Sequence, residues 1–180
     1  HAGLGGRRGF RVGIARRPAR DPAAGRGGAP DADALAVVGA SGSGKSSLVM
    51  AGLIPVLGLE YVIFRPGTDP LGVLESAKGK SLVVVDQFEE LFTLCRSELE
   101  QHTFVENVLT AALQPSGRTI VVIAIRADFY AHCAQFDLLR RAVSNYQEYI
   151  GPMSMDDLRR AIEEPAKRGH WEIEPGLVAV

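Results

Sequence analysis

Cysteine is scarce in this chain, since Cys95 and Cys133 are the only two among 180 residues. Two cysteines make neither a disulfide framework nor a metal site. A cysteine without a partner of this kind is most often a small buried apolar residue. We therefore interpret both side chains as reduced, buried thiols, which is typical of a cytoplasmic protein.

Long apolar runs are also missing. No run approaches the roughly 18 residues that a membrane-spanning helix requires. No apolar signal-peptide segment follows the basic N-terminal region. The chain begins with His1 rather than methionine, which is consistent with a fragment or a processed product. Hydrophobic residues nevertheless make up 46% of the sequence, enough for the core of one α/β domain.

The net charge is close to zero, at −1, but it is unevenly distributed. Residues 1–30 carry seven arginines and a single acid, Asp21, while the rest of the chain is acidic overall. Glycine, alanine and proline dominate this region, so we predict a flexible arm over residues 1–33. An arginine-rich arm can bind the phosphates of nucleic acid. Only Phe10 is available to stack on bases, so we favour an arm without a nucleic-acid partner.

Apolar runs that do not alternate with polar residues recur along the rest of the chain, as in the buried strands of a parallel sheet. We expect strands at residues 35–38, 61–64, 81–86, 119–125 and 147–150. We expect helices between and after them, at about residues 44–53, 70–79, 88–95, 97–113, 129–143 and 155–164. Pro55 and Pro165 are expected to end or bend the first and last of these helices. This alternation predicts an α/β fold with about five mostly parallel strands flanked by helices.

The segment 39–46 reads GASGSGKS and joins the first predicted strand to the first predicted helix. It fits G-x-x-x-x-G-K-[ST], the Walker A or P-loop pattern, in the context that gives this pattern its meaning. Glycines let the backbone approach an anion, and successive N–H groups form a nest at a helix N-terminus. Lys45 is expected to reach the β- and γ-phosphates, and the Ser46 hydroxyl to bind Mg²⁺. The predicted nucleotide-binding residues are Gly39, Ala40, Ser41, Gly42, Ser43, Gly44, Lys45, Ser46 and Ser47.

Charged residues follow the third predicted strand. Asp86 closes this apolar run as a Walker B aspartate does, and we expect it to hold Mg²⁺ opposite Ser46. The alternative for Asp86 is a helix N-cap. Glu89 and Glu90 are the candidate catalytic residues, because hydrolysis needs a group that orients or deprotonates water. Their alternative role is to place negative charge at the start of a helix.

Arg126 and Gln87 complete the predicted catalytic edge. Arg126 ends the fourth predicted strand and is a third catalytic candidate, since a cation there would meet charge on the transferred phosphoryl group. Its alternative is an ion pair with Asp86, Asp128 or a glutamate. Gln87 stands where many AAA+ ATPases have a catalytic glutamate. Glutamine positions water but is a poor base, so we expect slow hydrolysis.

Several blocks of the sequence resemble the NTPase domain of the novel STAND class, signal-transduction ATPases related to NACHT and other AAA+ regulators. In DQFEEL, as in the NACHT pattern, two acids lie three and four positions after the aspartate; here these are Glu89 and Glu90. The resemblance covers residues 34–178 and rests on five blocks, VVGASGSGKSSLVMAGLIPVL, VIFRPGTDPLGVL, LVVVDQFEELFTLC, IVVIAIRADFYAHC and GPMSMDDLRRAIEEPAKRGHWEIEPGLV.

The resemblance implies a P-loop NTPase core at residues 34–152 and the start of a helical lid at 153–180. It also implies ATP or ADP with Mg²⁺ as cofactors. The expected function is an ATP-binding regulatory switch of a signalling NTPase, with slow Mg²⁺-dependent hydrolysis. Its expected partners are flanking sensor or effector domains such as WD40 repeats, in an assembly that depends on the nucleotide.

Two alternatives to this switch remain at this stage. The first is a non-catalytic or degenerate P-loop scaffold. It is motivated by Gln87 and by the connection at residues 67–80, whose 14 residues are fewer than in most members of the class. The second, weaker alternative is a nucleic-acid-associated ATPase that uses the arginine-rich arm.

Overall fold

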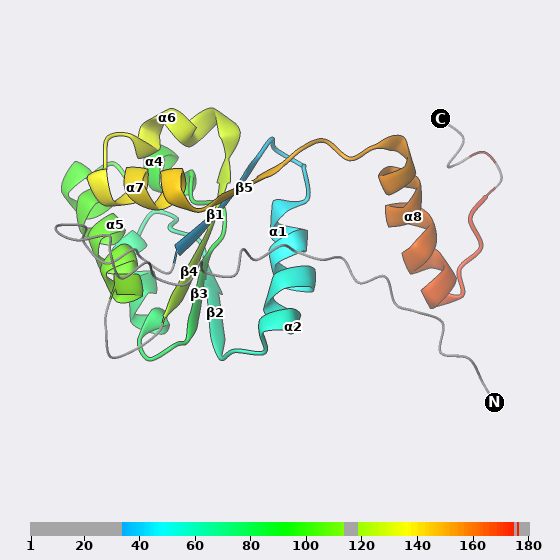
Figure 1. The fold of residues 1–180 in the computed structure, drawn as a ribbon, viewed down its shortest axis with the longest axis horizontal. Coiled ribbons are helices and arrows are strands. Elements are labelled where there is room, and N and C mark those ends of the chain that lie inside the picture. Colours follow the sequence, from blue (N-terminus) through cyan, green and yellow to red (C-terminus); the bar gives the residue numbers. More distant parts are fainter. Residues whose placement is uncertain (1–33, 114–118, 175, 177–180) are drawn as a thin grey trace, which may run out of the picture.

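A computed structural model describes residues 34–113, 119–174 and 176 of the chain. The arm predicted at residues 1–33 lies outside the described residues. The described part contains one five-stranded sheet with helices on both faces, and a further helix that lies apart from these layers (Figure 1).

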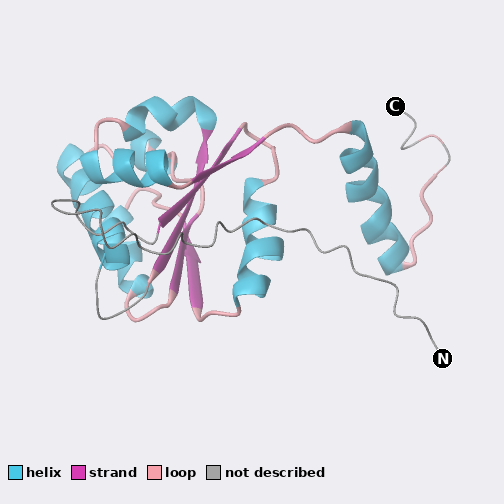
Figure 2. Ribbon diagram, in the orientation of Figure 1, coloured by secondary structure: helices cyan, strands magenta, loops and turns pink. Residues whose placement is uncertain are grey.

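The strands run parallel in the order β2-β3-β4-β1-β5 (Figure 2). They are β1 (Ala34–Gly39), β2 (Tyr61–Phe64), β3 (Leu82–Val85), β4 (Ile120–Arg126) and β5 (Gln147–Ile150). The prediction of an α/β fold with about five parallel strands is thereby confirmed. Because β4 lies between β1 and β3, the ends of these three strands meet at one edge of the sheet.

Helical segments follow each strand. The first is continuous from α1 (Lys45–Ser47) through a π-helical segment (Leu48–Leu53) into α2 (Ile54–Leu57) and covers one face of the sheet. The others are α3 (Pro70–Val73) with a 3₁₀ turn (Leu74–Ala77), α4 (Glu90–Thr93), α5 (Glu98–Leu113), a 3₁₀ turn (Ala127–Phe129), α6 (Tyr130–Cys133), α7 (Asp137–Asn145) and α8 (Met155–Gly169). Helices α4 to α7 cover the opposite face (Figure 1).

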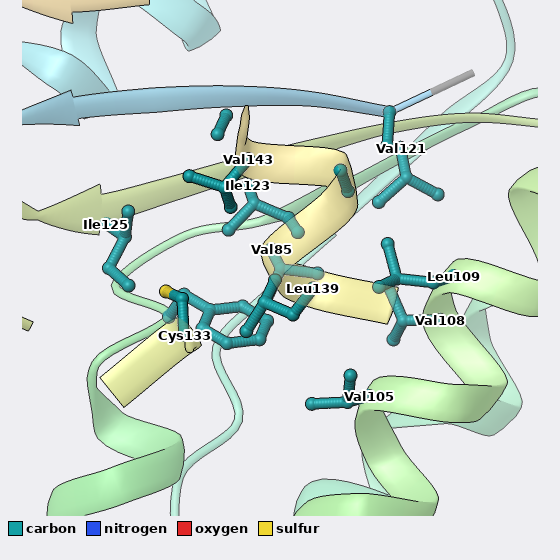
Figure 3. Close-up of a cluster of buried hydrophobic side chains, with 14 of the residues drawn as sticks. Val85, Val105, Val108, Leu109, Val121, Ile123, Ile125, Cys133, Leu139 and Val143 are labelled. Carbon is teal, nitrogen blue, oxygen red and sulfur yellow. The ribbon is translucent and has the colours of Figure 1, made fainter. Parts of the chain in front are cut away.

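The core has two parts because consecutive residues of each strand point to opposite faces of the sheet. Val85 and Ile123 point to the larger part and pack with side chains of α5 and α7 such as Leu109 and Leu139 (Figure 3). Their neighbours on β3 and β4 belong to the smaller part under α1 and α2. Burial on both faces explains why these strands are continuous apolar runs.

Both cysteine side chains are buried on the α4 to α7 side, as the sequence indicated. Burial raises the pKa of the Cys133 thiol to about 11. Burial also raises the pKa of Cys95, with a smaller contribution from the carboxylate of Glu100.

Because only the thiolate is nucleophilic, we expect both cysteines to react with iodoacetamide at pH 8 at least about tenfold more slowly in the folded chain than in urea. A raised pKa in the folded state means that Cys133 keeps its proton after the unfolded chain has lost it. Its contribution to stability is therefore complete below pH 9 and is lost as the pH rises towards about 11. Rapid labelling of the folded chain, counted by mass spectrometry, would contradict this placement.

The two internal prolines do not end their helices where the sequence predicted. The first helix continues past Pro55 to Leu57, and the last continues past Pro165 to Gly169. The π-helical segment before Pro55 changes the hydrogen-bond pattern where its ring would otherwise meet a helical carbonyl. Pro165 lies on an exposed turn, where water can bind the carbonyl that loses its N–H partner.

Within the described residues, no helix has both the length and the apolar character needed to span a lipid bilayer. Side chains cap the first turns of α3 and α8. The carboxylate of Asp69 accepts from the Gly72 N–H at 2.9 Å, and the hydroxyl of Ser154 accepts from the Asp157 N–H at 3.2 Å.

Candidate functional site

The glycine loop lies where the sequence predicted, between the end of β1 and the start of α1. Gly42 and Gly44 have φ of 74° and 88°, a left-handed conformation that glycine adopts without steric cost. Gly44 is the N-cap of α1, and no side chain among the described residues caps this end of the helix. The first turn therefore presents backbone donors and the positive end of the helix dipole to the loop.

Gly39 is required by close packing rather than by its own dihedral angles. A Cβ built on Gly39 would lie 2.5 Å from the carbonyl oxygen of Ile150 on β5 and 2.8 Å from Ser43 Oγ. Both are far below normal contact distances, and the first atom belongs to a paired strand. Glycine at this position therefore allows β5 to pair closely beside the loop.

We expect Gly39→Ala to lower the free energy of unfolding by about 1–3 kcal/mol, because overpacking displaces the backbone of β5. Urea denaturation measures this change. Gly52→Ala is the matched control, since a Cβ at Gly52 meets its nearest atom at an ordinary 3.5 Å and alanine favours helix. Equal destabilisation by the two substitutions would contradict the close approach at Gly39.

Lys45 is buried and turns back on its own loop. Its Nζ donates to the carbonyl oxygens of Gly39 at 3.0 Å and Ala40 at 2.7 Å. Burial lowers the pKa of Lys45, while the carboxylate of Glu89 is the strongest charged influence that opposes this shift. A buried ammonium beside a nest of backbone donors makes the loop suitable for an anion with several negative oxygens.

Ser46 and Asp86 lie 40 positions apart in sequence and meet at the end of the sheet. The Ser46 hydroxyl donates to Asp86 Oδ1 at 2.6 Å, and Asp86 is buried. Because α4 begins at Glu90, Asp86 is not the N-cap that the sequence analysis considered as an alternative. The two side chains that the sequence predicts as Mg²⁺ ligands are thus in direct contact.

A residue that the sequence analysis missed contacts the same carboxylate. Arg65 directly follows β2, and its Nε lies 3.8 Å from Asp86 Oδ2. With the Gln87 amide in the orientation that satisfies its neighbours, its oxygen accepts from Arg65 Nη2 at 3.1 Å and its nitrogen donates to Glu90 Oε1 at 2.9 Å. Glu90 is therefore connected to Asp86 through Gln87 and Arg65.

Glu89 is placed differently from Glu90. Its Oε2 accepts from the backbone N–H of Arg126 at 3.2 Å, which joins the end of β3 to the end of β4. The Arg126 guanidinium forms an ion pair with Asp128, the alternative that the sequence left open, and lies 5.6 Å from the centre of the Phe129 ring. The hydrogen bond from Arg126 lowers the pKa of Asp128. Glu89 and Arg126 both act on the pKa of Lys45, which the Glu89 carboxylate raises and the Arg126 guanidinium lowers.

Two buried polar atoms at this site, Ser43 Oγ and Arg126 Nε, have no hydrogen-bond partner within the described chain. Such an atom needs an explanation, which a bound water molecule, ion or ligand can supply. Among the described residues, no group of three or more His, Cys, Asp or Glu could hold a metal ion. Mg²⁺ bound to a nucleotide needs fewer protein ligands, because phosphates and water supply the rest. Ser46 and Asp86 therefore fit this ion together with a nucleotide.

A model of one protein family, described as Novel STAND NTPase 1, matches residues 27–81 and 72–180 of the chain. The two matches overlap at residues 72–81, in the connection between β2 and β3 that the sequence analysis noted as short. No curated protein matches the chain.

Solved structures share the fold at low sequence identity. A DNA replication initiation factor has a TM-score of 0.53 and 14% identity, over 82% of this chain and 48% of its own. AMPPCP-bound DnaA from Aquifex aeolicus has a TM-score of 0.51 and 15% identity, over 83% and 50%. The ORC2 protein of Aeropyrum pernix, in ADPNP–ADP complexes, has a TM-score of 0.52 and 12% identity, over 77% and 47%. The chain spans about half the length of these proteins, whose fold is that of AAA+ P-loop ATPases.

Proposed function

Because this chain belongs to the novel STAND NTPase 1 family, we propose that it is the nucleotide-binding switch domain of a signalling protein. In this proposal it binds ATP or ADP with Mg²⁺ and hydrolyses ATP slowly. The observation that carries the proposal is the convergence of Lys45, Ser46 and Asp86 at the end of the sheet.

Nucleotide binding uses groups that are already in place. The backbone donors of the loop and α1 receive the phosphates, and Lys45 exchanges its two carbonyl partners for phosphate oxygens. Ser46 and Asp86 hold Mg²⁺, which when bound neutralises charge on the transferred phosphoryl group. Arg126, whose buried Nε has no hydrogen-bond partner in the described part of the chain, adds positive charge on the same side.

Glu89 is the better candidate of the two glutamates for activating water. A backbone N–H fixes its carboxylate, and this carboxylate raises the pKa of Lys45 more than any other charged group does. Glu90 contacts Gln87, so we assign it a positioning role in the Arg65 network. Gln87 cannot act as an efficient base, which supports slow turnover.

Helix α8 supports a nucleotide-dependent change of conformation. Met155, Leu158 and Ile162 follow one another at helical spacing, and all three are exposed. The linker before α8 contacts the loop, since a Cβ on Gly44 would lie 3.1 Å from Met153 Cε. In the proposed switch, residues 153–180 form the start of a lid whose apolar face packs differently with ATP and with ADP. Flanking sensor or effector domains are the proposed partners of this movement.

Fluorescence of Trp171 tests the switch. Trp171 is the only tryptophan in the sequence, is 75% exposed, and lies two residues after the end of α8. At saturating nucleotide, its emission maximum should differ between the complexes with a non-hydrolysable ATP analogue and with ADP. Leu158→Ser should reduce this difference by weakening the apolar face. Identical spectra for the two saturated wild-type complexes would rule out the switch while leaving nucleotide binding in place.

A scaffold that binds no nucleotide is the second candidate. It is favoured by the contacts that Lys45 and Asp86 already make within the chain, which leave neither group without a partner. Titration with nucleotide distinguishes the two functions, because the scaffold gives no saturable binding of ATP or ADP.

A further inference from the structure

Arg65 lies beside the carboxylate that would bind Mg²⁺, although nothing in the P-loop pattern requires a cation there. The position is fixed by the backbone. Phe64 pairs with Val85 in the parallel register of β2 and β3, and the Asp86 N–H donates to the Phe64 carbonyl at 2.9 Å. The residue that follows β2, Arg65, is therefore adjacent to Asp86 whatever its side chain does.

The guanidinium of Arg65 is held at two points. Its Nε faces Asp86 Oδ2 at 3.8 Å, and its Nη2 donates to the Gln87 amide oxygen at 3.1 Å. Gln87 has a φ of 51°, a conformation that is uncommon for a residue other than glycine and that often occurs at functional sites. The turn after β3 thus brings a side-chain acceptor back to Arg65.

In this arrangement the carboxylate of Asp86 has a donor and a cation beside it. Ser46 Oγ donates to Oδ1, and Arg65 Nε lies 3.8 Å from Oδ2. A metal ion bound between Ser46 and Asp86 would have to share this carboxylate with the positive charge of Arg65. The side chain of Arg65 is 56% exposed, so it can move into water at low cost. Competition of this kind weakens metal binding without preventing it.

We propose that Arg65 is an internal cation that replaces Mg²⁺ at Asp86 in the nucleotide-free chain and thereby raises the Mg²⁺ concentration needed for nucleotide binding. This inference rests on the proposed function and adds a Mg²⁺ threshold to it. Arginine suits the role because its charge does not depend on pH in the physiological range.

The test is a calorimetric titration with a non-hydrolysable ATP analogue, at a series of buffered free Mg²⁺ concentrations and in chelator. Arg65→Met should reach half of the Mg²⁺-dependent gain in affinity at roughly threefold to tenfold lower free Mg²⁺ than wild type. Arg65→Lys, which keeps the charge, should stay near wild type. Arg140→Met is the matched control, because Arg140 is 52% exposed and pairs with Asp137 on α7, away from the loop.

An unchanged or higher Mg²⁺ requirement in Arg65→Met overturns the proposal. Weaker binding of the analogue by Arg65→Met in chelator also overturns it, since Arg65 would then contact the nucleotide rather than compete with the ion. Failure of the proposed function looks different, because wild type itself would bind no analogue at any Mg²⁺ concentration. Circular dichroism of each variant confirms that the comparison is made between folded chains.

Discussion

Replacing Lys45 with alanine is expected to weaken ATP binding about 100-fold while the fold is retained. The ammonium is the buried cation of the loop, and it gives charge-assisted hydrogen bonds that alanine cannot replace. Its present acceptors are two carbonyl oxygens of the same loop. We therefore expect Lys45→Ala to reduce the free energy of ATP binding more than it reduces the free energy of unfolding. Isothermal titration with ATP in the presence of Mg²⁺ measures the change.

Lys78→Ala is the control for this experiment. Lys78 is 72% exposed and pairs with Glu75 in the connection between β2 and β3, outside the loop. The Lys78→Ala substitution removes the same charge from the chain but should leave the affinity for ATP within about twofold of wild type. Equal affinity of Lys45→Ala and wild type for ATP would show that the nucleotide binds outside the glycine loop.

Glu89→Gln is expected to slow ATP hydrolysis roughly 100-fold or more, with little change in nucleotide affinity. Glutamine keeps the size of the side chain and can still accept from the Arg126 N–H, but it cannot take a proton from water. Single-turnover release of phosphate measures the chemical step, and titration with an ATP analogue measures binding separately.

Glu90→Gln separates the two adjacent carboxylates. Glu90 contacts the Gln87 amide, so its loss should slow hydrolysis far less than the loss of Glu89. A larger effect at Glu90 would reverse the assignment of the two residues. Phosphate release by wild type at the background rate would remove the catalytic part of the proposal and leave only binding.

The strands were predictable because each is a continuous apolar run bounded by loop residues. The predictions for β2 and β5 agree with the structure at both ends, and the other three agree within one residue at each end. The order of the strands was not predictable in the same way, since it depends on pairing between distant segments. The insertion of β4 between β1 and β3 places the strand that ends in Arg126 between the strands that precede the loop and Asp86, and no local pattern indicates this.

Parts of the site followed from the sequence by a single argument, that residues after parallel strands meet at one edge. This argument brings Ser46 and Asp86 together, and the structure places them in direct contact. The same argument applies to Arg65, which follows β2, but no motif drew attention to it. The sequence did contain a signal for Arg65 as a site residue, because a charged residue there directly follows an apolar strand.

The different contacts of the Glu89 and Glu90 carboxylates could not be predicted from the sequence, for a physical reason. It depends on the left-handed conformation of Gln87, which glutamine does not favour and which the tertiary structure imposes. The continuation of α8 past Pro165 was missed because proline costs less where water can bind the freed carbonyl. In both cases the surroundings of the residue decided the outcome.

Isothermal titration of the purified chain with ATP and with ADP, each with and without Mg²⁺, tests nucleotide binding most directly. We expect saturable binding of one nucleotide per chain, tightened by Mg²⁺ and lost in Lys45→Ala. Absence of saturable heat for both nucleotides at millimolar concentration, from a chain that circular dichroism shows to be folded, would contradict a nucleotide-binding switch and favour the scaffold.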